Sequence, residues 1–216
     1  MLTAMKEKSI AVVIVSNGPG ELSTWVKPVI NALKKLINKS ERLNYIFRLV
    51  LVPCPYAMGK EHEVARNWNE FQLVTPSKNF WKLLIKPSIY GKWPKTGIVV
   101  FLGGDQFWSI LLAKRLGYKN ITYAEWIARW PRWTDIITAM NNKVKNKLPK
   151  QYQQKCLVIG DLMADIECNK KIDSRIGGEN WIAILPGSKK TKLSIAIPYF
   201  LEVANYLSNK NPNINL

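Results

Sequence analysis

Three short segments of the sequence combine glycine with side chains that can take part in chemistry. The first runs from Ser16 to Glu21 (Ser-Asn-Gly-Pro-Gly-Glu), the second is Gly103-Gly104-Asp105, and the third, at 185–190, reads Leu-Pro-Gly-Ser-Lys-Lys. Each follows an apolar run and precedes a stretch with helical periodicity. Ligands bind at such strand-to-helix junctions in doubly wound α/β sheets, so we expect the chemistry of this protein there.

The first junction offers backbone N–H groups and a carboxylate. Glycines allow the backbone to approach a ligand closely, and a helix N-terminus favours an anion. We therefore expect Asn17, Gly18 and Gly20 to bind substrate or its phosphate groups, with Glu21 available as a proton acceptor. The spacing is not G-x-G-x-x-G, so a dinucleotide site is not indicated. A tight turn without a ligand is the alternative for these glycines.

The second junction ends a strongly apolar run with a carboxylate. Gly104 would line the ligand crevice, and Asp105 would take a proton from a hydroxyl group there. The alternative for Asp105 is a helix cap, in which its side chain accepts from the backbone of the following helix. The pattern leaves both roles open, and it does not decide whether Asp105 or Glu21 is the general base.

The third junction has the groups that bind a diphosphate. Gly187, Ser188 and Lys189 would present backbone N–H groups, a hydroxyl and an ammonium group together at a helix start. This is less than a complete Walker loop.

Other reactive side chains are few. His62 is the only histidine, and its polar neighbours indicate an exposed helix face. The cysteines at 54, 156 and 168 have neither a disulfide pattern nor zinc-ligand spacing. We expect no metal and no cofactor.

The net charge of +17 predicts affinity for an anionic partner. Of the 32 basic residues 25 are lysine and seven are arginine. Proteins that read bases rely on arginine forks, so nucleic acid is not the expected partner. A non-catalytic basic protein that binds membranes or RNA remains an alternative.

One segment, Ser77–Lys95, combines lysines and aromatic residues with no acidic residue. Such a face suits an anionic bilayer interface, so we expect it to contact a membrane or lipid acceptor through Lys78, Trp81, Lys82, Lys86 and Trp93. The alternative is a solvated loop with its aromatic rings in the core. A second cluster would either stack on a sugar or a base or belong to the core, and it comprises Trp126, Arg129, Trp130, Arg132 and Trp133.

Alternating strands and helices predict an α/β fold, a Rossmann-like parallel sheet with helices on both faces. The expected strands are Ile10–Val15, Tyr45–Val52, Ile98–Leu102, Asn120–Tyr123, Ile136–Met140, Cys156–Ile159 and Trp181–Leu185. Helices are expected over Thr24–Ile37 with Thr24 as cap, over Met58–Trp68, through Leu111–Leu116 up to Gly117, and over Ile195–Leu207.

The same pattern predicts two domains. Residues 1–168 would form an acceptor-side Rossmann-like domain, the polar stretch 169–180 a linker, and 181–216 the start of an incomplete nucleotide-sugar-binding domain. No uncharged run approaches the roughly 18 residues that span a bilayer.

Taken in order, these segments resemble the lipid-A-disaccharide synthase family, a GT-B glycosyltransferase family with two Rossmann-like domains. The residues that carry the resemblance are Gly20-Glu21, Phe101 to Asp105, Val158-Ile159-Gly160, Met163-Ala164-Asp165 and Ile184 to Ser188. The chain departs from the family at Leu22-Ser23-Thr24, at Asp161 in place of His and at Lys189 in place of Arg, which indicates a divergent branch.

The resemblance implies transfer of an acylglucosamine-type sugar from a UDP donor to a lipid-linked acceptor at the membrane surface. Asp105 or Glu21 would deprotonate the acceptor, and the enzyme would be cytoplasmic and peripheral at the inner face of the membrane. Another UDP-sugar enzyme of GT-B fold, such as an epimerase, would have similar junctions and is the alternative.

Overall fold

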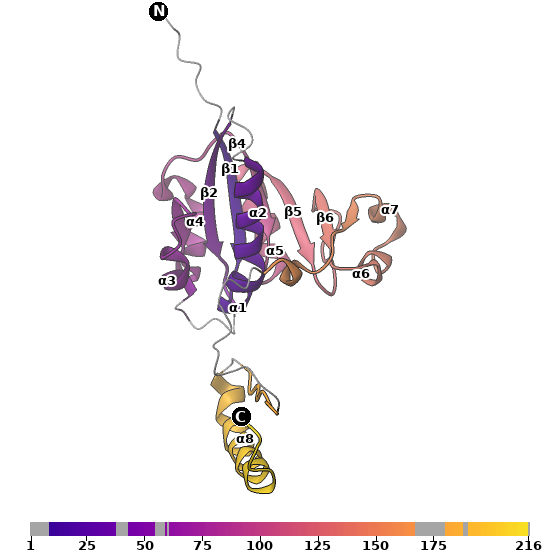
Figure 1. Cartoon of the computed structure of the whole chain (residues 1–216). Helices are drawn as coiled ribbons and strands as arrows, with labels where there is room; N and C mark the ends of the chain where they lie inside the picture. Colours follow the sequence, from indigo (N-terminus) through magenta and orange to yellow (C-terminus); the bar gives the residue numbers. More distant parts are fainter. Residues whose placement is uncertain are drawn as a thin grey trace, which may run out of the picture. The chain divides into compact units, whose positions relative to one another are not determined.

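The computed structural model describes residues 9–37, 43–54, 59, 61–166, 180–187 and 190–215. The chain divides into two compact units, Met1–Glu167 and Cys168–Leu216. Unit 1 is a Rossmann-like α/β domain with a parallel sheet, as the sequence predicts (Figure 1).

The sheet of unit 1 has seven strands in the order β3-β2-β1-β4-β5-β6-β7. They are β1 (Ser9–Ser16), β2 (Asn44–Leu51), β3 (Leu73–Thr75), β4 (Thr96–Phe101), β5 (Lys119–Ala124), β6 (Ile136–Ala139) and β7 (Cys156–Val158), and all pairs are parallel. The chain leaves β1 toward β2 on one side and returns beside β1 with β4 on the other. The point where the strand order reverses therefore lies between β1 and β4, where ligands bind in such sheets.

The first helical stretch begins earlier than predicted. It runs through α1 (Pro19–Glu21), the π-helical turn η1 (Leu22–Val26) and α2 (Lys27–Ile37). Gly18 is the N-cap and Pro19 the first helical residue, a position that suits proline because its missing N–H has no partner there. The expected cap at Thr24 is therefore wrong, and its hydroxyl instead donates to the Gly20 carbonyl at 2.9 Å.

The other helices of unit 1 are shorter. They are α3 (Glu61–Arg66), η2 (Ser77–Asn79), α4 (Phe80–Ile85), η3 (Pro87–Tyr90), α5 (Gln106–Leu116), α6 (Asn142–Asn146), α7 (Lys150–Gln153) and η4 (Leu162–Asp165). The segment α3 ends before Trp68, the predicted end, while part of the predicted start at 58 lies outside the described residues. As expected, α5 stops at Gly117, which has a left-handed backbone.

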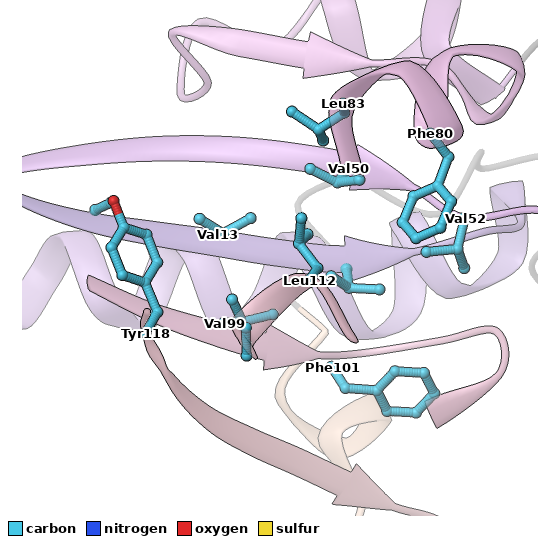
Figure 2. Packing of buried hydrophobic residues seen from close by; sticks show 12 residues of the cluster. Val13, Val50, Val52, Phe80, Leu83, Val99, Phe101, Leu112 and Tyr118 are labelled. Atoms are coloured by element: carbon cyan, nitrogen blue, oxygen red, sulfur yellow. The ribbon is translucent and has the colours of Figure 1, made fainter. Parts of the chain in front are cut away.

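Apolar side chains cover both faces of the central strands. In β1, Ala11, Val13 and Val15 face one cluster, while Val12 and Ile14 face the other, because successive side chains of a strand alternate. The first cluster packs under α4 and α5, and Figure 2 shows Phe80, Leu83 and Leu112 from these helices against Val13, Val50 and Val99. The second packs under η1 and α2.

Unit 2 contains the 21-residue helix α8 (Lys190–Lys210). The predicted strand Trp181–Leu185 is not formed in the described residues, where only Trp181 bridges to Asn215. A strand requires a neighbouring strand for its backbone hydrogen bonds, and no other ladder is present in the described part of this unit. No helix in the described ranges is both long and apolar enough to cross a bilayer.

Candidate functional site

A cavity of about 420 Å³ lies at the carboxyl ends of β1, β4 and β5, where the strand order reverses. Its lining includes Asn17 and Glu21 after β1, Gly104 and Asp105 after β4, and Glu125 after β5. The first four of these were predicted from sequence as site residues. The structure therefore brings the first two predicted junctions together in one pocket.

Glu21 is held between two residues that lack side chains. Its carboxylate folds back onto the backbone of Gly18, where an added Cβ would collide with it. A Cβ on Gly103 would lie only 3.0 Å from both the Glu21 Cγ and the Ser16 Oγ. Gly18 and Gly103 thus leave the space that the Glu21 side chain occupies. Gly20, by contrast, has nothing within 4 Å of an added Cβ and lies in the first helical turn.

Asp105 caps the helix that follows it. Its Oδ1 accepts from the Phe107 backbone N–H at 2.9 Å, and Oδ2 lies 3.9 Å from the Arg129 guanidinium. The helix-cap role, which the sequence left open, is therefore present in the structure. Gly104 before it has φ +95°, and an added Cβ would lie 2.6 Å from the Val52 side chain. This position therefore requires glycine. The catalytic role of Asp105 stays a prediction.

Glu125 is a pocket carboxylate that the sequence analysis missed. Burial raises the pKa of this carboxyl, a hydrogen bond from the Trp126 side chain opposes the rise, and the Asp161 and Glu21 carboxylates add to it. Glu125 follows β5 just as Asp105 follows β4, so the strand-end rule would have found it. No glycine marks the position, and this is why it passed unnoticed.

The loop after β5 is fixed by Gln106, the first residue of α5. Its buried amide donates to the Ile127 carbonyl at 2.8 Å and accepts from the Arg129 N–H at 2.6 Å. These two bonds hold Arg129 beside Asp105 and keep the loop at the rim of the pocket. Sequence reasoning had no signal for this role, because a glutamine in a first helical turn is ordinary.

A third motif contacts a residue of the pocket wall. The Tyr123 hydroxyl donates to the Gly160 carbonyl at 3.2 Å, and the Tyr123 ring meets Trp25 edge-on at 5.6 Å. Burial raises the pKa of Tyr123, as do the nearby Asp161 and Glu125 carboxylates, while a backbone hydrogen bond opposes this. The segment Val158-Ile159-Gly160 is thus tied to the side of the site that Tyr123 forms.

Asn17 carries an unusual feature of the pocket. The residue is 8% exposed, and its Oδ1 has no hydrogen-bond partner among the described residues. Buried polar atoms are almost always paired, so this oxygen, which solvent does not reach, is an exception in the structure.

The aromatic cluster after β5 lies at the surface, so its interpretation as core is wrong. Trp126 is 69% exposed and lines the pocket, while Trp130 and Trp133 stack at 5.4 Å. Phe107 of α5 continues this set of rings, because it lies 5.8 Å from Trp130. The cluster is therefore available to a ligand.

The segment Ser77–Lys95 forms η2, α4 and η3, which the sequence did not predict as helical. Lys78, Lys82 and Lys86 are exposed and Trp81 is about half exposed. Trp93 differs, because the Arg48 guanidinium covers its ring at 3.9 Å and its Nε1 donates to the Pro87 carbonyl. Trp93 is thus part of the packing and lies apart from the exposed set.

The predicted diphosphate loop belongs to unit 2. Gly187 has φ +91°, a backbone that glycine adopts readily, whereas Ser188 and Lys189 lie outside the described residues. Among the described residues, no three His, Cys, Asp or Glu side chains are grouped so as to hold a metal ion. Cys54 and Cys156 are not in disulfide bonds within the described part of the chain, and His62 is half-buried on α3 rather than exposed.

No protein-family model and no curated protein matches the chain. Solved structures with a similar fold include UDP-GlcNAc 2-epimerase from Methanocaldococcus jannaschii, with 16% identity over 71% of this chain and 45% of that one and a TM-score of 0.45. An S. aureus MnaA–UDP co-structure shares 12% identity over 81% of this chain and 52% of that one, with a TM-score of 0.48. UDP-GlcNAc 2-epimerase from Neisseria meningitidis bound to UDP-GlcNAc shares 12% identity over 72% of this chain and 47% of that one, with a TM-score of 0.44.

The chain spans about half the length of these three structures. None of the three is a lipid-A-disaccharide synthase. Identities of 12–16% and TM-scores below 0.5 carry no argument about function.

Proposed function

We propose that this chain is the acceptor-side part of a UDP-sugar enzyme of the GT-B class, in which pocket carboxylates move a proton on a sugar. The observation that carries the proposal is the gathering of Glu21, Asp105 and Glu125 in one cavity at the β1–β4 reversal point. The order of the motifs, from Gly20-Glu21 to the Pro-Gly-Ser loop, supports the same class.

Within this proposal Glu125 is the proton acceptor. Burial and the neighbouring carboxylates raise its pKa, and a base whose pKa lies nearer to neutrality transfers protons more effectively in both directions. The Asp105 carboxylate already accepts from the α5 backbone with one oxygen and faces Arg129 with the other. Taking up a proton at Asp105 would therefore compete with contacts that stabilise the fold.

In the same proposal unit 2 contributes the start of the donor half. The loop at 185–190 would hold the UDP diphosphate, with Lys189 offering charge to the leaving group. A lysine presents a point charge rather than the bidentate fork of arginine, so the diphosphate would be held with less geometric restraint.

The proposed class includes two reactions with different products. Transfer to a lipid-linked sugar releases UDP, as the resemblance to lipid-A-disaccharide synthases implies. Inversion at C2 keeps UDP attached to the sugar, and this is the chemistry named in the titles of two similar structures. A pocket carboxylate serves either reaction, since the first removes a hydroxyl proton and the second a carbon-bound one.

The test is to incubate the full-length protein that carries this chain with UDP-N-acetylglucosamine, with and without a lipid-linked sugar, and to follow products by ³¹P and ¹H NMR. UDP release indicates transfer, and a new C2 epimer indicates epimerisation. Glu125→Gln should lower either rate by about 10²–10⁴-fold. The control is Glu63→Gln, which changes an exposed carboxylate of α3. Absence of both products across UDP-hexoses, together with salt-sensitive binding to RNA, would favour the basic binding protein instead.

We further propose that the exposed face of Ser77–Lys95 contacts an anionic membrane. Trp81, Ile85 and Ile89 are 51%, 74% and 63% exposed there, beside Lys82 and Lys86. An amphipathic face that combines lysines with aromatic and aliphatic side chains binds the headgroup region of anionic bilayers.

Vesicle sedimentation tests this membrane contact. Each near-surface lysine contributes about 1 kcal/mol, so reversing Lys82 and Lys86 to Glu should weaken binding by at least about 30-fold. The variant with Lys143→Glu and Lys150→Glu changes the net charge equally on α6 and α7 and should bind as wild type. Equal loss in both variants would show that only the net charge matters.

A further inference from the structure

A row of aromatic side chains connects α4 with the loop that follows β5. Trp81 of α4 meets Trp108 of α5 with 5.2 Å between the ring centroids. Phe107 lies 5.3 Å from Trp108 and 5.8 Å from Trp130. Trp133 completes the row by stacking on Trp130 at 5.4 Å. We call these five residues the aromatic band. Ring contacts therefore join side chains from three separate parts of the chain into one feature.

The aromatic band lies at the surface and is held there by the fold. Trp108 anchors it, because this ring packs against the core cluster under α4 and α5. Phe107 is exposed, and Trp81, Trp130 and Trp133 are about half exposed. Trp130 has φ +56°, a conformation that costs energy for a bulky residue. Contiguous exposed apolar surface marks sites of contact with a protein or a membrane.

The segments that bear the aromatic band have an excess of positive charge. The sequence has no acidic residue between Glu70 and Asp105, and Glu125 is the only one between Asp105 and Asp135. Asp105 and Glu125 line the cavity, and Asp135 pairs with Lys119. The exposed cations of the same segments are Lys78, Lys82, Lys86, Lys114, Arg129 and Arg132. Apolar rings among cations complement a surface that is anionic outside and apolar within.

The aromatic band begins where the pocket wall ends. Gln106 lines the cavity, and the next residue, Phe107, belongs to the band. Arg129 likewise lines the cavity, and Trp130 after it belongs to the band. The same two chain segments therefore carry the rim of the pocket and the band. A partner that covers the band lies next to the pocket.

We propose that the aromatic band enters the headgroup layer of an anionic bilayer and places the rim of the pocket at the membrane surface. Tryptophan prefers this layer because its ring is largely apolar and its N–H is polar. Single-stranded nucleic acid instead stacks its bases on free ring faces. In the band, Trp130 and Trp133 cover each other, and the Lys114 ammonium lies 5.2 Å from the Trp133 ring centroid. The inference rests on the proposed function and names the surface from which a lipid-linked acceptor reaches the pocket.

Vesicle sedimentation at low and high salt tests the proposal on the full-length protein that carries this chain. The vesicles contain phosphatidylglycerol and phosphatidylcholine. High salt screens the lysines but does not weaken the burial of apolar rings. The variant with Trp130→Ala and Trp133→Ala should bind about 10–100-fold more weakly at both salt concentrations, because two rings no longer enter the bilayer. The control with Leu36→Ala and Val64→Ala should bind as wild type, because it removes two exposed apolar side chains on the opposite face of the sheet.

A second measurement needs no variant. Lipids brominated in the acyl chains quench nearby tryptophan, so the bound wild-type protein should lose part of its fluorescence, and the loss should persist at high salt. Absence of vesicle binding, unquenched fluorescence, or equal binding of wild type and the ring variant would overturn the proposal. Loss of poly(U) binding alone in the ring variant would assign the band to RNA and overturn it as well.

Failure of this inference is distinguishable from failure of the proposed function. Binding is measured without turnover, so ring-dependent vesicle binding by an inactive protein contradicts the proposed function alone. Turnover of a water-soluble acceptor by a protein whose vesicle binding ignores the rings contradicts this inference alone.

Discussion

Replacing Asp105 in two ways separates its structural role from any catalytic one. Asp105→Ala removes the acceptor for the Phe107 N–H, and losing such a cap costs about 1 kcal/mol. The contact with Arg129 adds a few tenths of a kcal/mol at most, because Arg129 Nη1 and Asp105 Oδ2 are 3.9 Å apart and both side chains are about half exposed. The sum of about 1–1.5 kcal/mol should lower the Tm of unit 1 by about 2–5 °C. Asp105→Asn keeps the side-chain acceptor and should change Tm by about 1 °C at most.

Thermal unfolding by circular dichroism measures both variants beside Asn141→Ala. Asn141 caps α6 through the Val144 N–H at 3.1 Å, so its removal should cost a similar amount away from the pocket. Equal destabilisation by Asp105→Asn and Asp105→Ala would refute the cap as the source of the effect. Turnover is then measured in Asp105→Asn, which keeps the fold. A fall of about 10²-fold or more at unchanged Tm would assign chemistry to Asp105 as well as to Glu125.

Three further changes test the pocket and the core. Burial raises the pKa of Glu125 above the ordinary 4.5, so the folded protein binds this proton more tightly than the unfolded chain does. The free energy of unfolding should therefore fall as the pH rises from 4.5 through the pKa of the folded state. Across that window Glu125→Gln should become more stable relative to wild type, as measured by urea unfolding at several pH values. Phe80→Ala empties a fully buried ring position and should cost about 3–5 kcal/mol by the same method. Gly97→Ala should lower the free energy of unfolding by about 1–3 kcal/mol, because the new Cβ would lie 2.8 Å from the Ala11 carbonyl oxygen. Gly20→Ala should leave the stability unchanged or increase it, because nothing lies within 4 Å of a Cβ at that helical position. Equal effects of the two substitutions would contradict the packing described.

The sequence predicted the main strands of unit 1 because β1 and β4 contain continuous apolar runs and β2 is apolar on both sides of Arg48, as expected of strands buried on both faces. It missed β3, since three residues are too few to establish a pattern. It also misplaced the start of the first helix, because Thr24 is a good cap in isolation, whereas the helix begins at Gly18-Pro19, six and five residues earlier. At the first helix, the turn at Gly18-Pro19 outweighed the local capping preference of Thr24.

Part of the pocket was predictable for a physical reason. Glycine marks places where backbone must bend or make room, so Gly18 and Gly20 pointed to the junction with Glu21, and Gly103 and Gly104 to the junction with Asp105. Glu125 has no such marker, and its importance depends on burial and on carboxylates that only the fold brings near. Trp93 illustrates the opposite case, since its lysine-rich, acid-free segment suggested a membrane-facing side chain, but Arg48 from β2 covers its ring. Interactions across the sheet leave no local pattern in the sequence.

The contrast between a basic protein and an acidic pocket bears on how a substrate is oriented. Lysines at 78, 82 and 86 and the arginines at 129 and 132 lie outside or at the rim of the cavity, while its lining has more carboxylates than cations. A substrate with an anionic phosphate at one end and an uncharged sugar at the other would therefore enter the cavity sugar first. A purely anionic ligand would remain on the lysine-rich surface. Added salt should therefore weaken binding of the anionic end to the lysine-rich surface steeply. Binding of the sugar end should depend less on salt, because direct hydrogen bonds would hold it in a partly enclosed site.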